Sequence, residues 1–151
     1  MDHVTKTDQS YLFWLFSLSF IFFYPMLISI YVFLPLMVGA IGYMLVQGLE
    51  RGKSSFILLA IVYMINLEVN LSLPLFLIII SALLFYVIFY PYFKHFRKCR
   101  ICRPLLSVVL LDLMYLGCLF TYDFIFQTQS IVLDEILLYS LIVDMLIVVI
   151  L

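Results

Sequence analysis

The sequence predicts an all-α integral membrane protein, a compact bundle of about six transmembrane helices joined by short loops. Of the 151 residues, 67% are hydrophobic and 11% are charged, and the mean hydropathy is +1.25. A typical soluble domain has about 25% charged residues, so a soluble fold of this length could not cover so much apolar surface. The apolar runs are continuous rather than alternating, which favours helices over a β-barrel.

A cluster of cations between two apolar runs orients the predicted bundle. The stretch from Pro91 to Pro104 holds five of the eight cationic side chains, namely Lys94, Arg97, Lys98, Arg100 and Arg103. Each would cost roughly 2.5 to 3.5 kcal/mol inside a membrane, so the stretch is expected to form a loop, and excess Lys and Arg marks the cytoplasmic side. Topology alone explains the cluster. Binding of anionic lipid or of a cytoplasmic partner stays open beside it.

The chain is predicted to be one polytopic transmembrane domain over residues 1–151, with residues 1–10 as a short cytoplasmic N-terminal segment. The net charge is −1, so no basic field for a nucleic-acid partner is expected. The three cysteines do not make a disulfide framework, since Cys99 and Cys102 fall in the predicted loop in the reducing cytoplasm.

The first two spans are expected in an uncharged run of 39 residues, Tyr11–Leu49. One span needs about 20 residues, so the run is divided into Tyr11–Leu27 and Val32–Leu49, with Pro25 and Pro35 as breakers. The alternative is one long tilted helix with an interfacial segment, which exceeds a reasonable tilt. The run is too long for a signal peptide, so the first span is predicted to be retained.

The other spans follow between short polar stretches. The polar loop Glu50–Lys53 precedes a short third span, Ser54–Leu67. The fourth span is Leu71–Phe93, with Pro74 at its start, where proline is tolerated.

The fifth span is Pro104–Phe126, and the sixth runs from Ile131 or Ile136 to Leu151. Six spans place both termini and all eight Lys and Arg residues in the cytoplasm. Five spans would move only Lys6 outside, so the span count stays open between five and six.

Asp112 and Asp144 are the sharpest chemical features, because each lies inside an otherwise apolar span. They are expected about 12 Å and about 10 Å from the cytoplasmic ends of adjacent helices, where they could face one another and share a proton. An intramembrane acid is by default a functional-site hypothesis, such as an ion or proton path. The simpler interpretation is that each acid pairs helices, through Tyr115, Ser107 or Ser140, or binds a partner protein.

Other motifs give weaker indications of chemistry. Tyr122-Asp123 is half of an intramembrane aspartyl protease motif, and the Gly-x-Gly-Asp half is missing, so that class is rejected. His95, Cys99 and Cys102 have the spacing of part of a zinc site, but no second cysteine pair exists; the neighbouring cations are expected to lower the pKa of these thiols. The sequence therefore predicts no enzyme, no catalytic residue, no cofactor and no metal, while leaving metal binding at this motif untested.

Several short motifs occur in an order known from one family. Phe33-Leu34-Pro35 stands at the start of the second span, Phe96-Arg97 lies in the basic loop, and Val109-Leu110-Leu111-Asp112 lies in the fifth span. The run Ile65–Pro74 corresponds to an acid-bearing turn, with Asn66 in place of the usual acid. Over about residues 11 to 126, this order resembles MreD, the small polytopic subunit of the bacterial rod-shape machinery, or elongasome.

The resemblance implies a non-enzymatic scaffold or interaction subunit of a cell-envelope complex, in the bacterial inner membrane with both termini cytoplasmic. Its implied partners are the lipid bilayer, MreC-like proteins and the RodA and transpeptidase enzymes of lateral peptidoglycan synthesis. It also implies a six-helix bundle similar to the substrate-binding subunits of vitamin importers. Asn66 and Glu68 join Asp112 and Asp144 as partner-binding or helix-pairing candidates.

The alternative function is a small membrane transporter or solute-binding subunit that uses Asp112 and Asp144. A lipid-modifying enzyme is disfavoured, because the acids are predicted to lie deep relative to the basic loop.

Overall fold

A computed structural model describes residues 2–31, 33–93, 95, 99–128 and 133–150, with residues 2–10 and 133–135 described as backbone alone. These residues form no strand, and their six helices are α1 (Asp2–Ile30), α2 (Val38–Arg51), α3 (Ser54–Asn70), α4 (Leu77–Phe93), α5 (Cys102–Phe126) and α6 (Leu133–Ile150). The predicted all-α class is confirmed for this part of the chain. Outside the described residues lie Ile131 and Leu151, which bound the predicted sixth span, and Lys94, Phe96, Arg97 and Lys98 of the predicted loop.

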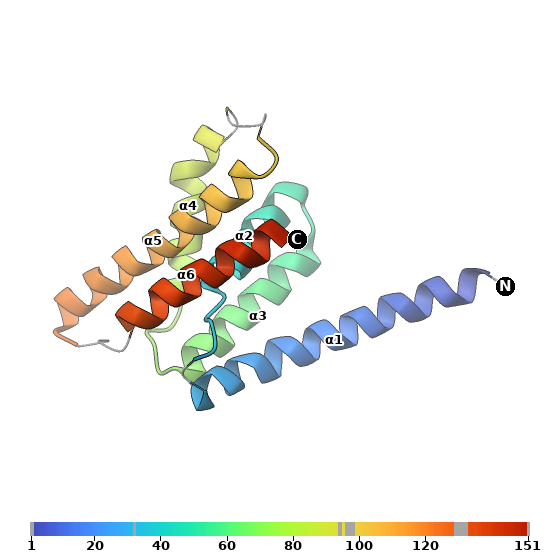
Figure 1. The fold of residues 1–151 in the computed structure, drawn as a ribbon, viewed down its shortest axis with the longest axis horizontal. Helices are drawn as coiled ribbons and strands as arrows, with labels where there is room; N and C mark the ends of the chain where they lie inside the picture. The colour runs from blue at the N-terminus through green and yellow to red at the C-terminus, as the bar shows by residue number, and fades with distance from the viewer. Residues whose placement is uncertain (1, 32, 94, 96–98, 129–132, 151) are drawn as a thin grey trace.

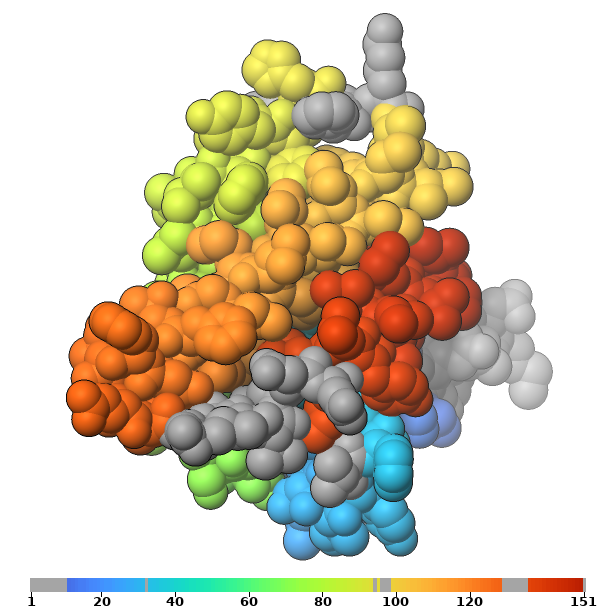
Figure 2. Space-filling model, turned by 60° about the vertical axis from the view of Figure 1, so that its left-hand side comes forward, coloured from blue at the N-terminus to red at the C-terminus, as the bar shows by residue number. Residues whose placement is uncertain are grey.

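Helices α2 to α5 enclose a shared apolar core, and α6 lies against α2 and α5 (Figure 1). Large buried side chains of this core include Tyr63, Met64, Phe85, Leu111 and Tyr115. Helix α1 packs along α3 at the edge of the bundle, and its N-terminal half extends beyond the other helices (Figure 1). Helices α4, α5 and α6 lie side by side on one outer face (Figure 2).

Two of the described helices contain segments long and apolar enough to cross a membrane, Tyr11–Ile30 in α1 and Cys102–Phe126, which is all of α5. Ser54–Asn70, Leu77–Phe93 and Ile136–Ile150 are apolar but shorter. Helix α2 has 14 residues. At 1.5 Å per residue it rises about 21 Å, less than the hydrocarbon core of about 30 Å. By length and composition, the described helices thus include two spanning candidates rather than the six predicted.

The break between the first two helices lies later in the chain than predicted. The first helix continues past Leu27 to Ile30, and the second begins at Val38 instead of Val32. The described residues between the two helices, 31 and 33–37, are non-helical, and Pro35 lies among them. Of the two predicted breakers, only the second therefore falls at the break.

Pro25 lies inside α1 without ending it. A proline removes the N–H that would bond the carbonyl four residues earlier, here the carbonyl of Ile21. Asn66 of α3 supplies the missing donor, since its Nδ2 lies 3.0 Å from the Ile21 carbonyl oxygen. Asn70 Nδ2 in turn donates to Asn66 Oδ1 at 2.8 Å, which fixes the orientation of the Asn66 amide. The prediction that Pro25 breaks the helix is wrong because a side chain from another helix replaces the lost bond.

The connection between α3 and α4 is longer than predicted. Helix α4 begins at Leu77 rather than Leu71, and the turn before it includes Ser72 and Phe76 at positive φ angles of 53° and 68°. Such angles are left-handed and incompatible with continuation of an α-helix. Pro74 therefore lies in a turn and not at a helix start.

The basic loop is shorter than the predicted Pro91–Pro104 stretch. Helix α4 includes Pro91 and ends at Phe93, and α5 begins at Cys102. Pro104 lies in the first turn of α5, where a backbone N–H would have no partner within the helix. Helical structure thus enters the predicted loop from both sides.

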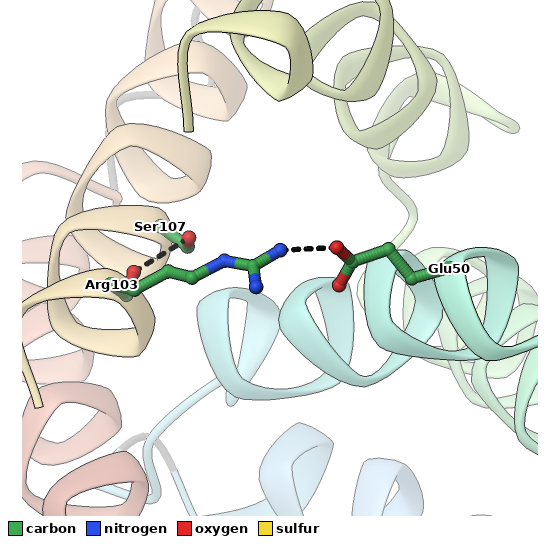
Figure 3. A network of polar contacts seen from close by, with 3 residues as sticks. All are labelled: Glu50, Arg103 and Ser107. Atoms are coloured by element: carbon green, nitrogen blue, oxygen red, sulfur yellow. Dashed lines mark hydrogen bonds and ion pairs between the residues drawn. The ribbon is translucent and has the colours of Figure 1, made fainter. Parts of the chain in front are cut away.

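An ion pair joins two helix ends near this loop. Glu50, near the end of α2, pairs with Arg103 in the first turn of α5, and Ser107 Oγ donates to the Arg103 carbonyl at 2.8 Å (Figure 3). The α2–α3 turn and the α4–α5 loop therefore lie at one end of the bundle, which agrees with their predicted placement on one side of a membrane.

Candidate functional site at the start of helix α2

The non-helical segment before α2 is held by side chains from three helices. Pro35 and Leu36 are buried there. Tyr24 of α1 donates its hydroxyl to the Pro35 carbonyl at 2.9 Å, and Tyr63 of α3 donates to the Leu36 carbonyl at 3.1 Å. The Leu36 N–H donates to Ser140 Oγ of α6 at 3.1 Å. Because buried backbone groups need partners, these bonds are what allow a non-helical segment inside the bundle.

Asp144 of α6 binds the N-terminus of α2. Met37, the residue at the N-cap position, has a left-handed conformation and makes no side-chain cap. The Gly39 N–H instead donates to Asp144 Oδ2 at 2.9 Å. A carboxylate at this position satisfies one of the free N–H groups at the helix start and interacts favourably with the positive end of the helix dipole.

Asp112 of α5 approaches the same glycine from another side. A Cβ atom added to Gly39 would lie 2.7 Å from Asp112 Oδ2 and 2.8 Å from Val108 Cγ1. Both acids therefore lie against Gly39, one at its N–H and the other where a side chain would be. The sequence left open whether Asp112 and Asp144 face one another, and the structure brings both acids against the same residue.

The hydrogen-bonding partners suggested for these acids do not bind them among the described residues. Ser140 accepts from Leu36, and Ser107 donates to the Arg103 carbonyl. The Tyr115 hydroxyl is buried without a hydrogen-bond partner among the described residues. The expected ties from the acids to Tyr115, Ser107 and Ser140 are thus absent from the described part of the chain, and the acids meet the backbone of α2 instead.

Glu68 performs a capping role at a second helix. It is fully buried near the end of α3, and its two carboxylate oxygens accept from the Phe76 and Ile78 N–H groups, each at 2.7 Å. These donors lie at the start of α4, whose first N–H groups have no partner within the helix. Glu68 therefore joins α3 to α4.

The four helix-pairing candidates occupy three places. Asp112 and Asp144 meet at the start of α2, Glu68 lies at the start of α4, and Asn66 lies beside Pro25 of α1. All four side chains lie within this chain's own bundle. The sequence suggested neither Tyr24 nor Tyr63 as part of the site. The only indication of such a role in the sequence is that a tyrosine lies in the middle of an apolar run while a proline marks a helix break elsewhere in the chain.

The described residues of the basic loop between α4 and α5 are not arranged as a metal site. Among the described residues, no group of three His, Cys, Asp or Glu side chains is arranged to hold a metal ion. Cys99 and Cys102 are exposed free thiols. The hydrogen bond between them is the main cause that raises the pKa of Cys99, so the expectation of a lowered pKa is wrong for this residue.

No protein-family model, curated protein or solved structure matches the chain. The interpretation of function therefore rests on the residues and their arrangement.

Proposed function

We propose that this chain is a multi-pass integral membrane protein that acts as a non-enzymatic scaffold or interaction subunit. The observation that carries the proposal is the contrast between the polar side chains buried in the bundle and the apolar side chains on its surface. Buried polar side chains bind backbone groups at helix starts and breaks, while large apolar side chains are exposed along the outer faces of α1, α4, α5 and α6. Such an exterior is suited to lipid and to other membrane helices, and exceeds what a soluble monomer exposes.

Helix α1 supports the membrane assignment most directly. Its helix contacts among the described residues are with α3 alone. Tyr11, Phe13, Phe16 and Phe23 are all well over half exposed. In water, this surface would be strongly unfavourable. In a bilayer it would contact acyl chains, and the cations of the basic loop support a cytoplasmic location for the α2–α3 and α4–α5 connections.

The membrane assignment can be tested with Trp14, which is the only tryptophan in the chain and lies on the exposed flank of α1. In vesicles with brominated acyl chains, its fluorescence should be strongly quenched, whereas aqueous acrylamide should quench it weakly. Efficient acrylamide quenching together with no effect of bromine would contradict insertion of α1.

The more specific form of the proposal is an MreD-like subunit of lateral wall synthesis in the bacterial inner membrane. The order of motifs from Phe33-Leu34-Pro35 to Asp112 supports it. The structural roles of Asn66, Glu68 and Asp144, each bound to backbone groups, favour a scaffold over an enzyme. The partners proposed on this basis are MreC-like proteins and the wall-synthesis enzymes.

Affinity purification in mild detergent with an N-terminal tag, followed by mass spectrometry, tests this function. Co-purification of MreC-like proteins or wall-synthesis enzymes is the expected result. Because α1 packs against α3 alone among the described helices, a Phe13→Ala/Phe16→Ala variant should reduce recovery. Phe124→Ala on α5, which also removes an exposed phenylalanine, is the matched control. Recovery of no partner by the wild-type chain would count against the scaffold.

A solute-binding or transport subunit is the second candidate, and the break before α2 favours it. Transporters commonly bind substrates where a discontinuous helix exposes its end near paired acids. Recovery of ATPase subunits in the same purification, or solute-dependent thermal stabilisation that Asp112→Asn abolishes, would move the protein to this class.

A further inference from the structure

Three carboxylate oxygens are buried around the start of α2 without a hydrogen-bond partner among the described residues. They are Oδ1 and Oδ2 of Asp112 and Oδ1 of Asp144. Asp112 is 3% exposed and Asp144 is 0% exposed. An ionised carboxylate in such surroundings is strongly unfavourable unless a compensating charge or a set of donors faces it.

The surroundings compensate one negative charge but not two. Asp144 accepts from the Gly39 N–H at 2.9 Å and lies at the helix start, which carries roughly half a positive charge. Asp112 instead faces the Cα side of Gly39, within 2.7 Å of where a Cβ would be. On the same helix as Asp112, Arg103 is already paired with Glu50 at the end of the bundle. The pair of acids therefore requires one further positive charge.

We propose that Asp112 and Asp144 form a proton-binding site, in which the two carboxylates hold one proton at neutral pH. Two acids that cannot both ionise behave as a single coupled unit. The ionised member is matched by the start of α2, and the protonated member supplies the donor that the orphaned oxygens lack. This inference does not depend on the proposed scaffold function.

A proton fits the site better than a metal ion. A hard cation needs several oxygen ligands, and the described residues contain no group of three side chains able to hold one. The Pro35 and Leu36 carbonyls that line the same break already accept from Tyr24 and Tyr63. A shared proton needs only the two carboxylates.

The other titratable groups near the site do not replace the pair. Tyr24 of α1 and Tyr63 of α3 are within electrostatic range of Asp144, but both donate their hydroxyls to backbone carbonyls. Tyr115 of α5 is buried, and its hydroxyl has no hydrogen-bond partner among the described residues. On α2, the titratable residue closest in sequence to Gly39 is Tyr43, and the tyrosines of α4 lie in its C-terminal half.

Loss of the proton to water changes helix packing under this proposal. Two ionised carboxylates would then repel one another inside the bundle. They belong to α5 and α6, and both lie against Gly39 of α2. The repulsion would therefore loosen α5 from α2 and α6, and high pH would destabilise the folded chain.

Infrared spectroscopy and unfolding of the full chain in detergent test the proposal. At neutral pH, the wild type should show a protonated carboxyl C=O band that is lost in Asp112→Asn. In mixed SDS micelles, a proton that only the folded state binds makes the free energy of unfolding fall as the pH rises. The unfolding constant then increases by up to about tenfold per pH unit. This dependence should flatten in Asp112→Asn, and Asp112→Ser, which also removes the carboxyl group, serves if that variant does not fold.

Glu68→Gln is the control for the other buried acid and should keep the band of the pair. The proposal is overturned if the band is lost only in Glu68→Gln, or if the wild type and Asp112→Asn show the same pH dependence. It is also overturned if sodium or lithium ions, rather than protons, stabilise the wild type in an Asp112-dependent way, because the site would then bind a metal ion.

Discussion

Gly39 determines how closely three helices approach at the start of α2. Its N–H binds Asp144, and its missing side chain leaves room for Asp112 and Val108. Gly117 of α5 has the opposite surroundings, since a Cβ added there would meet nothing within 4 Å. The two glycines therefore provide a matched comparison between a close contact and open space.

Gly39→Ala is predicted to destabilise the chain by about 1–3 kcal/mol, because the new methyl group forces Asp112 and Val108 to move in a packed interior. Gly117→Ala should be neutral or stabilising by about 0.5–1 kcal/mol, since alanine is favoured within a helix. Unfolding in mixed SDS micelles measures both. Equal effects of the two substitutions would show that the close approach at Gly39 is not present.

At the scale of helices, single side chains decide where each element continues or begins. Helix α1 passes through Pro25 because Asn66 of α3 donates to the Ile21 carbonyl. Helix α4 begins where the Glu68 carboxylate accepts from the Phe76 and Ile78 N–H groups. In both cases, the partner of an orphaned backbone group comes from α3.

Asn66→Ala is predicted to destabilise the chain by about 1–3 kcal/mol, the range for leaving a buried acceptor unsatisfied. Pro25→Ala restores a backbone N–H at this turn, so Asn66→Ala should have a smaller effect in that background. A double-mutant cycle measured by SDS unfolding gives the coupling between the two residues. Additive effects would contradict the assigned role of the Asn66 amide.

Glu68→Ala is predicted to destabilise the start of α4 by about 1–3 kcal/mol, because two N–H groups at the helix start lose their acceptor. Hydrogen exchange should show faster exchange of the Phe76 and Ile78 amides. Thr121→Ala is the control, since its exposed hydroxyl donates within its own helix. Unchanged exchange at Phe76 and Ile78 would rule out capping by Glu68.

At the scale of the whole molecule, the connections divide between two ends of the bundle. The Glu50–Arg103 ion pair joins the α2–α3 and α4–α5 connections at one end. Both partners are partly exposed, so the pair contributes at most about 1 kcal/mol to stability. Its value lies in fixing which connections share a side of the proposed membrane.

Labelling in a Cys118→Ser background tests this sidedness. A membrane-impermeant maleimide is expected to modify the exposed Cys99 and Cys102 in inverted vesicles but not in intact spheroplasts. Because the hydrogen bond with Cys102 raises the pKa of Cys99, and the thiolate is the reactive form, labelling of Cys99 should accelerate as the pH rises above neutral. Labelling from outside intact spheroplasts would reverse the proposed topology.

The sequence by itself determined the all-α class and the approximate helices, and it indicated similar depths for Asp112 and Asp144 in adjacent spans. Composition and continuous apolar runs report how each segment partitions between water and an apolar medium, and helical rise gives the depth of each acid. These quantities depend on residues near one another in the chain, so one sequence suffices to predict them.

The tertiary structure alone decided the exact helix ends and the partner of each buried polar group. Pro25 is tolerated because of Asn66, and the break before α2 is held by Tyr24, Tyr63 and Ser140. These partners lie far apart in the sequence and meet only when the helices pack. Local propensity marks where a backbone hydrogen bond is lost, whereas the three-dimensional arrangement determines which distant side chain replaces it.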